Sequence, residues 1–561
     1  MLITSATQSD DPSNLHDLAL AAYQAGRFDD ADSLADQILQ HDLAHVGALH
    51  LKGLRAYASG DATSALTWLD RAIRIKPEPI LYNTLYAIHL SLGNYVAAID
   101  SLRQGLALEP NFAVLHYNLA LTLQHHERLD EAAISYRRTL ELEPSNSSAQ
   151  NNLGRIHADL GALDQAERHY RRALELSPTN LVARNNLAMA LLAAGRYEEA
   201  WPYFEDRWIS FKHVDGRPAR VPVQVPLPRW HGERRATDGD ASTASASANN
   251  LLVLDEQGFG DSLQFVRYLP LLLARFDRVG YVCPPPLRRL YEQSLGGARG
   301  PNLALLDATP ADLSDWDCHC PLMSLPMAFR TRLDTIPDEL PYLHADARQT
   351  AAWRARLDAL PNAQRPRIGV VWAGGHSGIA VDRLRSLSFT QIAPLLTLPH
   401  LHWISLQKAD DPAKRADAGA DTDAGGDISS TSHPNPRHPL NALTDWTDEL
   451  ADFADTAALI ANLDLVISVD TSVAHLAAAM GKPVWLLNRF AGCWRWLRER
   501  DDSPWYPGLR LFTQTRRGDW DDVLARVAGA LLQRFPYAAA PRRHPTQEQP
   551  EPRQPRVQQP N

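Results

Sequence analysis

Residues 149–178, AQNNLGRIHADLGALDQAERHYRRALELSP, are one copy of a repeated unit that decides the fold of the first part of the chain. Two segments of helical length flank Gly161, and Pro178 closes the unit. A glycine supplies the left-handed cap that commonly ends a helix, and a proline cannot continue one. The unit therefore predicts a hairpin of two helices.

Three kinds of marker residue, namely prolines, alanines and turn glycines, recur in one register along the chain at intervals of 33 or 34 residues. The alanines suit a close crossing of two helices, and Glu127 takes the place of one turn glycine. A single hairpin cannot bury its apolar face but a stack can, so the spacing predicts about six stacked hairpins over residues 11–210. The markers are Pro77, Pro110, Pro144 and Pro178; Ala31, Ala65, Ala98, Ala132, Ala166 and Ala200; and Gly26, Gly60, Gly93, Gly161 and Gly195.

These units resemble tetratricopeptide repeats, whose stacks form a concave groove. Asn118, Asn152 and Asn186 recur every 34 residues. In repeats like those of the protein O-GlcNAc transferases, asparagines at this position hold an extended peptide, and an amide suits that role because it both donates and accepts hydrogen bonds. The resemblance implies that the groove binds a protein acceptor or partner. Packing between helices is the alternative role of these asparagines.

Bulk composition restricts the class of protein. The 561 residues, 45% hydrophobic and 22% charged, are typical of a globular protein and too many for one core. A net charge of -10 disfavours nucleic-acid binding, and no apolar run approaches the ~18 residues of a membrane helix. Four cysteines are too few for a disulfide framework, and Cys318-His319-Cys320 lacks the usual spacing of a metal site. We therefore expect a cytoplasmic protein without a transmembrane segment.

Three segments lack any apolar period. Residues 211–249 form a Pro-rich linker that ends in a low-complexity insert, residues 410–438 are rich in Asp, Ala, Gly, Ser and Pro, and residues 539–561 are a Pro/Gln/Arg tail. Such compositions do not form a packed core. We expect disorder in the low-complexity part of the linker, in the insert at 410–438 and in the tail.

The region from residue 250 to 536 alternates short apolar runs with amphipathic segments. This alternation predicts an α/β fold with a parallel sheet, whose ligands bind beyond the carboxyl ends of the strands. The fold class of the chain is thus an α-solenoid followed by an α/β region. We expect strands at 251–255, 279–283, 368–373, 402–407, 465–469 and 483–487, and helices at 262–275, 348–360, 456–462, 473–480 and 520–534.

Glycines and polar side chains follow several of these strands. The first such segment, residues 254–263, contains Asp261 and lacks the third glycine of a dinucleotide fingerprint, because Leu263 stands in its place. Glycines let a phosphate approach the backbone, an arginine neutralises it and a helix N-terminus attracts it. The candidates for nucleotide and phosphate binding are Gly258, Gly260, Gly374, Arg385, Lys408, Asp470, Thr471 and His475.

Segments 256–270, 460–487 and 503–507 resemble glycosyltransferase family 9, the ADP-heptose:lipopolysaccharide heptosyltransferases, and resemble its tetratricopeptide-fused members more closely still. The resemblance implies a two-lobed, Rossmann-like GT-B fold, with an acceptor-side lobe at 250–345 and a nucleotide-sugar-side lobe at 366–536. It places Asp261 on the family's catalytic aspartate. It places Asp470, Thr471 and His475 on the motif that binds the nucleotide diphosphate.

The chemistry of these residues suits glycosyl transfer. The reaction needs a base for the acceptor hydroxyl and stabilisation of the leaving diphosphate. Asp261 is the candidate base, and the helix N-terminus at Thr471, with His475, Arg385 and Lys408, is the candidate diphosphate site. We expect an inverting glycosyltransferase that uses a nucleotide-diphospho-sugar as substrate, with no metal and no cofactor.

Other roles remain open for the same residues. Asp261, Asp470 and Thr471 also suit capping of the helices that follow them. Arg385 suits a solvated loop and Lys408 the start of the polar insert. The competing functions are a non-catalytic tetratricopeptide scaffold with a degenerate transferase domain and a nucleotide-sugar epimerase. Core packing is the alternative to sugar stacking for Trp494, Trp496, Trp505 and Tyr506.

Overall fold

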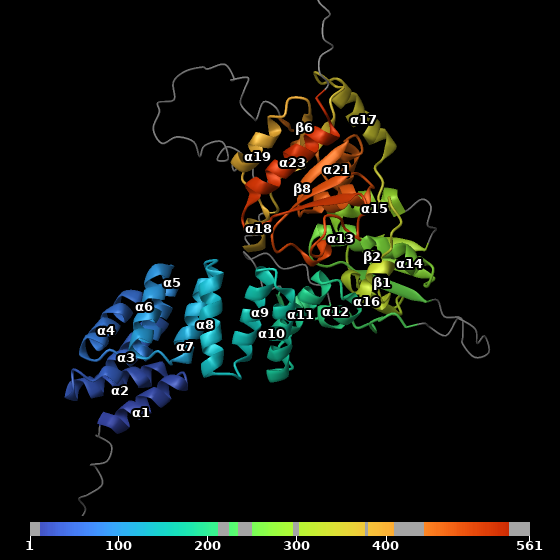
Figure 1. The fold of residues 1–561 in the computed structure, drawn as a ribbon. Helices are drawn as coiled ribbons and strands as arrows, with labels where there is room; N and C mark the ends of the chain where they lie inside the picture. The colour runs from blue at the N-terminus through green and yellow to red at the C-terminus, as the bar shows by residue number, and fades with distance from the viewer. Residues whose placement is uncertain are drawn as a thin grey trace, which may run out of the picture.

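The computed structural model describes residues 12–210, 224–233, 249–295, 302–375, 380–408 and 443–537. The insert at 410–438, the tail at 539–561, and residues 211–223 and 234–248 of the linker lie outside the described residues. An elongated array of helices leads into a region with two sheets (Figure 1). None of the helices in the described part of the chain is long and apolar enough to cross a bilayer.

The array is built of helical hairpins stacked in sequence order, as the repeat spacing predicts (Figure 1). Each hairpin packs on the next, and the alanine markers are buried where its two helices cross. The hairpins are α1 (Pro12–Gln24) with α2 (Phe28–His41), α3 (Val46–Ala58) with α4 (Ala62–Ile75), α5 (Pro79–Ser91) with α6 (Tyr95–Leu108), α7 (Ala113–His125) with α8 (Leu129–Leu142), α9 (Ser147–Asp159) with α10 (Leu163–Leu176), and α11 (Leu181–Ala193) with α12 (Tyr197–Phe204).

The turn inside each hairpin needs a residue in the left-handed region. The marker glycines have φ between 73° and 83°, a conformation that glycine adopts at little cost. Glu127, which occupies the glycine position of one repeat, adopts the same conformation with φ of 63°. The register of the repeat therefore fixes the turn even where the residue type does not favour it.

A four-stranded parallel sheet follows the array, with strand order β3-β2-β1-β4. The predicted single helix at 262–275 is wrong: Pro270 has no N–H to donate, and the segment divides into α13 and α14 around a 3-10 turn at Val266–Tyr268. The elements are β1 (Asn250–Leu254), α13 (Phe259–Phe265), α14 (Leu269–Leu273), β2 (Arg278–Val282), α15 (Pro285–Leu295), β3 (Leu303–Leu306), β4 (Cys318–Pro321) and α16 (Leu325–Ala328).

A second parallel sheet has six strands in the order β10-β9-β8-β5-β6-β7. Four of its strands overlap the predicted strands, whereas β7 and β10, the two edge strands, were not predicted. The elements are α17 (Ala347–Asp358), β5 (Arg367–Val371), α18 (Ala380–Arg385), α19 (Phe389–Leu396), β6 (His402–Ser405), β7 (Leu443–Thr444), α21 (Phe453–Ile460), β8 (Leu465–Val469), α22 (Ser472–Ala479), β9 (Val484–Asn488), β10 (Leu509–Thr513) and α23 (Trp520–Arg534).

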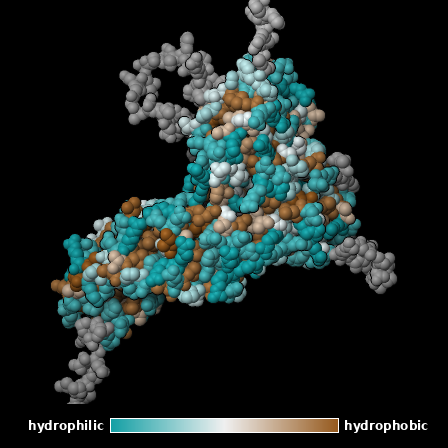
Figure 2. Space-filling model, viewed as in Figure 1, coloured by the Kyte–Doolittle hydropathy of each residue, from teal (hydrophilic) through white to brown (hydrophobic). Residues whose placement is uncertain are grey.

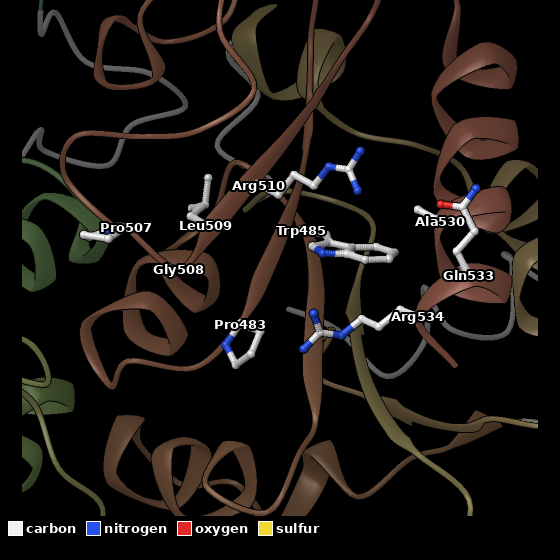
Figure 3. A pocket seen from close by; sticks show the side chains of 9 residues that line it. All are labelled: Pro483, Trp485, Pro507, Gly508, Leu509, Arg510, Ala530, Gln533 and Arg534. Carbon is white, nitrogen blue, oxygen red and sulfur yellow. The ribbon is translucent and has the colours of Figure 1, made fainter. Parts of the chain in front are cut away.

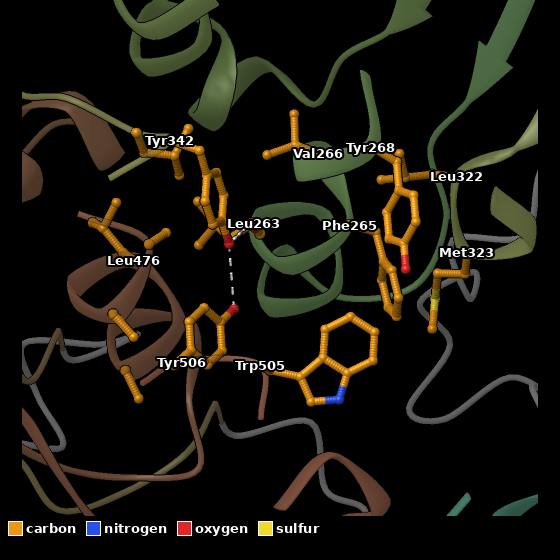
Figure 4. Packing of buried hydrophobic residues seen from close by; sticks show 14 of the residues in the cluster. Leu263, Phe265, Val266, Tyr268, Leu322, Met323, Tyr342, Leu476, Trp505 and Tyr506 are labelled. Carbon is orange, nitrogen blue, oxygen red and sulfur yellow. Dashed lines mark hydrogen bonds between the residues drawn. The ribbon is translucent and has the colours of Figure 1, made fainter. Parts of the chain in front are cut away.

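One apolar core runs from the last repeats into both sheet regions. It joins Tyr197 and Trp201 of α12 to Phe265 of α13 and to Trp505 of the second region. Side chains of α13, α22 and the segment 505–506 pack together there (Figure 4). Trp494, Trp496, Trp505 and Tyr506 are all buried, in agreement with the core-packing interpretation.

A buried ion pair ties the end of the array to the first sheet. The Arg207 guanidinium donates through Nε and Nη2 to the Glu256 carboxylate, at 2.8 and 2.6 Å. Both side chains are buried, and Glu256 also accepts from the Trp208 indole at 2.6 Å and the Met323 N–H at 3.1 Å. These donors satisfy the buried carboxylate, so the ion pair attaches the segment after α12 to the segment after β1.

The outer surface of the array carries several exposed apolar side chains, and apolar patches are visible on the face shown in Figure 2. Leu43, Val96 and Ile134 are the most exposed of those in the array. They occupy different positions within their repeats, so they do not form one periodic stripe.

Candidate functional site

Two short helices meet at their N-terminal ends, one from each sheet region. The helix α13 follows β1 and α22 follows β8, so both start beyond the carboxyl ends of parallel strands. A Cβ on Gly260 would lie 3.0 Å from His475 Cδ2 and 3.6 Å from Ser472 Cα. Gly260 therefore allows this close approach, which brings Asp261 near the Asp470–His475 segment.

Asp261 is held at both carboxylate oxygens. Its Oδ2 accepts the Gly258 N–H at 2.9 Å, which completes a capping arrangement at the start of α13. Its Oδ1 accepts from the Arg495 guanidinium in an ion pair. The side chain is 19% exposed. The capping role considered from the sequence is thus present, and an ion pair that the sequence did not indicate is added to it.

Arg495 is the main residue of this region that sequence reasoning missed. It lies in a Trp-Arg-Trp turn at Trp494–Trp496, 234 residues after Asp261, and is 8% exposed. The pKa of Arg495 is raised, because attraction to Asp261 and neighbouring groups outweighs the desolvation that opposes it. The available signal was an arginine between two tryptophans, a pattern more typical of core packing.

His475 is buried and neutral. Burial, and secondarily the positive charge of Arg495, lower the pKa of His475 to about 3. Its Nδ1 lies 2.9 Å from the Tyr506 hydroxyl, and its ring stacks on Trp496 at 5.3 Å between centroids.

The Tyr506 hydroxyl lies between His475 and Tyr342. The Tyr342 hydroxyl donates to the Leu263 carbonyl at 2.9 Å and lies 3.5 Å from the Tyr506 hydroxyl (Figure 4). The shorter contact of Tyr506 is the one to His475 Nδ1, and the tautomer of the imidazole decides which of the two atoms donates in it. The other ring nitrogen, Nε2, lies 3.8 Å from Asp470 Oδ1.

The segment 470–471 contacts α18. Arg385 Nη1 donates to the Asp470 carbonyl at 2.8 Å, and Arg385 also pairs with Asp382. A Cβ on Gly374 would lie 2.6 Å from Arg385 Nε, so Gly374 leaves the space that this guanidinium occupies. The Thr471 hydroxyl bonds to Ser468 Oγ at 3.0 Å and makes no capping bond to α22. The side-chain capping role considered for Thr471 is thus not seen.

Lys408 has a different neighbour. It is exposed at the end of the segment after β6, and its ammonium donates to the Leu450 carbonyl at 2.6 Å. The structure therefore brings together Gly258, Gly260, Asp261, Asp470, Thr471 and His475, links Arg385 and Gly374 to that group through the Asp470 carbonyl, and directs Lys408 toward the segment before α21.

The array asparagines each bond to the preceding repeat. Asn118 Nδ2 donates to Asn83 Oδ1 at 2.7 Å, and Asn186 Nδ2 donates to Asn151 Oδ1 at 2.9 Å. Asn152 Nδ2 lies 3.4 Å from the Tyr117 hydroxyl and 3.1 Å from the Tyr136 hydroxyl. In each case one bond spans 35 residues, so the asparagines link neighbouring repeats.

Comparison with known families agrees with this two-part organisation. Residues 16–78, 88–146, 117–180 and 169–201 match tetratricopeptide-repeat models. The array is made of tetratricopeptide repeats. Residues 450–487 match the model of glycosyltransferase family 9 (heptosyltransferase), and this segment contains Asp470, Thr471 and His475, whereas Asp261 lies outside it. The matches support a glycosyltransferase joined to tetratricopeptide repeats.

Similar proteins include one curated relative and several solved structures. Protein FlbA of Caulobacter vibrioides is 25% identical over 489 residues, which cover 84% of this chain and 70% of FlbA. MamA from Desulfovibrio magneticus RS-1 is 19% identical over 31% of this chain and 99% of MamA, with a TM-score of 0.27. Pseudomonas aeruginosa pilF is 14% identical over 36% of this chain and 91% of its own, with a TM-score of 0.33.

A surface pocket of about 410 Å³ lies at the other end of the second sheet (Figure 3). Pro483 and Leu509, at the amino ends of β9 and β10, line it together with Trp485, Arg510 and Arg534. His475 follows the carboxyl end of β8. Because β8 is parallel to β9, this is the opposite end of the sheet from the pocket. The pocket is therefore separate from the candidate site.

Proposed function

We propose that the chain is an inverting, metal-independent glycosyltransferase of the two-lobed GT-B type that uses a nucleotide-diphospho-sugar. The proposal rests on one observation: the contact of Gly260 with His475 brings Asp261 close to the N-terminus of α22. The α22 side belongs to the segment that matches glycosyltransferase family 9. The described part of the chain has two parallel sheets, and each contributes one strand to this point: β1 leads into α13 and β8 leads into α22. This supports the two-lobed assignment.

In the proposed reaction, Asp261 accepts the proton of the acceptor hydroxyl. The acceptor oxygen bonds to the anomeric carbon from the face opposite the leaving group, while the carbon–oxygen bond to the diphosphate breaks. Negative charge develops on the departing nucleoside diphosphate, where the N–H groups of α22 and the Arg385 guanidinium stabilise it. His475 is neutral, so its contribution is a hydrogen bond rather than a charge.

The array has the role of recruiting a protein acceptor or partner in this proposal. Tetratricopeptide repeats are protein-interaction modules. An amide has two N–H groups and an oxygen with two lone pairs, so a bond to the neighbouring repeat leaves capacity for a peptide backbone. If changing Asn118, Asn152 and Asn186 together to alanine leaves the amount of co-purifying partner unchanged, the groove does not act through these asparagines.

The nucleotide part is tested by a thermal-shift panel of UDP, ADP, GDP and CMP on the full chain. A nucleotide present at 100 times its Kd stabilises the folded state by about 2.7 kcal/mol. We expect one of the diphosphates to raise the unfolding temperature, and Arg385→Gln to reduce that rise. No shift with any of the four contradicts the proposal.

A non-catalytic scaffold is the second candidate, and one observation favours it. Both oxygens of Asp261 are already engaged, by the Gly258 N–H and by Arg495. If the scaffold is the function, an Asp261→Asn/His475→Gln double variant that still folds retains the cellular activity of the wild type. The transferase proposal predicts that this variant is inactive.

A further inference from the structure

We propose that Arg495 is a positioning residue for Asp261, and that the last hairpin of the repeat array holds Arg495 in place. The inference rests on the proposed function, in which Asp261 accepts the acceptor proton. In this inference the array supports the candidate site and also offers a surface for partners.

Arg495 is fixed on several sides. Its Nε donates to Gln264 Oε1 at 2.5 Å, and its Nη1 donates to Cys493 Sγ at 3.1 Å. Its Nη2 pairs with Asp261, and its guanidinium carbon lies 4.7 Å from the centre of the Trp494 ring. A guanidinium held by these contacts fixes the position of the carboxylate oxygen that Nη2 binds, Asp261 Oδ1.

Trp494 is the anchor of the turn that carries Arg495. Its ring lies edge-to-face against three aromatic rings of α12, at centroid distances of 6.1 Å to Tyr197, 6.0 Å to Trp201 and 6.0 Å to Phe204. Trp494 is 5% exposed. The last hairpin of the array thus supplies three aromatic rings that pack against the tryptophan next to Arg495.

A second attachment holds the other end of the same loop. The Trp505 indole N–H donates to the Tyr197 hydroxyl at 2.9 Å, and the Trp505 carbonyl accepts from Arg267 of the first sheet region at 2.9 Å. Tyr197 therefore contacts the loop both at Trp494 and at Trp505. Trp494 precedes Arg495 and Trp505 follows it, so the array contacts the loop on both sides of Arg495.

The backbone of the loop has unusual conformations at two residues. Leu497 has φ of 55° and ψ of -169°, and Glu499 has φ of 55°. Residues other than glycine rarely adopt such conformations, and they persist where the surrounding structure determines them. Gln257, which precedes Gly258 on the opposite side of the ion pair, also has a left-handed φ of 60°.

The test compares Trp494→Leu and Arg495→Gln with two matched controls. Trp485→Leu truncates a tryptophan of the same region that is also 5% exposed but lies beside the separate pocket. Arg500→Gln removes an arginine of the same loop that pairs with Asp502 at 2.5 and 2.7 Å. Turnover is followed as nucleoside diphosphate released when UDP-glucose, UDP-N-acetylglucosamine, GDP-mannose or ADP-heptose transfers its sugar to water.

We expect Trp494→Leu and Arg495→Gln to lower kcat by about 10- to 100-fold with little change in the KM for the donor, because a misplaced base affects the chemical step more than binding. Arg495→Lys keeps the charge and retains more of kcat than Arg495→Gln. Both controls keep the wild-type kcat. Wild-type kcat in Trp494→Leu and Arg495→Gln, or a loss confined to KM, overturns the inference.

Hydrogen exchange separates this inference from the proposed function. The Gly258 N–H donates to Asp261, and this bond is weakened when Asp261 loses its position. We therefore expect the peptide that contains Gly258 to exchange its amide hydrogens faster in Trp494→Leu and Arg495→Gln than in the wild type or in Trp485→Leu. Unchanged exchange in both variants contradicts the positioning role. A wild-type chain that releases no nucleoside diphosphate from any of the four donors contradicts the proposed function, while the exchange result still decides whether Arg495 positions Asp261.

Discussion

The Arg495 guanidinium pairs with the Asp261 carboxylate across 234 residues of sequence. Asp261 lies in the first turn of α13, the helix that follows β1 of the first sheet, and Arg495 lies in a turn between β9 and β10 of the second sheet. The candidate site is therefore assembled from both sheet regions, and neither region contains it alone.

Asp261→Asn tests the role of the carboxylate. The amide oxygen can still accept the Gly258 N–H, so the start of α13 is preserved while the base is lost. We expect kcat for donor turnover to fall by about 100- to 10,000-fold with the donor KM nearly unchanged. Asp346→Asn is the matched control, because Asp346 caps α17 by accepting the Gln349 N–H at 2.8 Å. Equal kcat in wild type and Asp261→Asn excludes Asp261 as the base.

His475 gives the folded chain a specific pH dependence. The pKa of His475 is lowered to about 3 in the folded state, against 6.5 as the ordinary value, so below pH 6.5 the unfolded chain binds a proton that the folded chain does not. The stability contributed at this residue is therefore lost as the pH falls from 6.5 toward 3. Between pH 6.5 and 5 the loss is about 2 kcal/mol.

His475→Gln checks this directly, because glutamine donates and accepts hydrogen bonds but does not titrate. Denaturant unfolding at pH 6.5 and pH 5 should show a smaller loss of stability in the variant, by about 2 kcal/mol. His344→Gln, at an exposed histidine, is the control. An equal pH dependence in His475→Gln and wild type shows that His475 is not buried and neutral as described.

The buried pair of Arg207 and Glu256 should control how the array is attached. Arg207→Met leaves the Glu256 carboxylate buried without its cation, which costs about 3–5 kcal/mol. The double variant Arg207→Met/Glu256→Met removes both charges and should recover much of that loss. Thermal unfolding of the two variants and the wild type measures the difference. A double variant less stable than Arg207→Met contradicts this account.

The bond of Asn152 to the neighbouring repeat predicts an effect on stability that is independent of any partner. Asn152→Ala removes the bonds to the Tyr136 and Tyr117 hydroxyls and should destabilise the array by about 1 kcal/mol. Asn94→Ala is the control, since Asn94 is exposed and makes no side-chain capping bond to α6. If the two variants unfold at the same temperature, the bonds of Asn152 do not stabilise the contact between repeats.

The repeat array could be predicted well from the sequence because its information is local and periodic. The spacing located the left-handed turn even at Glu127, where φ is 63°. The helix at Trp520–Arg534 was predicted at its observed bounds, and Asp519 caps it by accepting the Asp522 N–H at 3.1 Å. The helix at 262–275 failed because Pro270 interrupts the hydrogen bonds that apolar periodicity alone implied.

The candidate site was only partly predictable. Gly260 and His475 stand at the ends of recognisable strands, and the structure brings them into contact. Arg495 leaves no periodic signature, because its position depends on Trp494 packing against α12 and on a partner 234 residues away. The burial of His475, which makes it neutral, likewise depends on tertiary neighbours such as Trp496 and Tyr506.

The central claim is inverting sugar transfer from a nucleotide-diphospho-sugar. Its most direct test is proton NMR of the purified full chain with each of the four donors named above, followed from the first minutes. The account predicts that one donor is consumed and that the sugar first appears as the anomer opposite to that of the donor. Consumption of none of the four donors, or release of the sugar with the donor's own anomeric configuration, would contradict it.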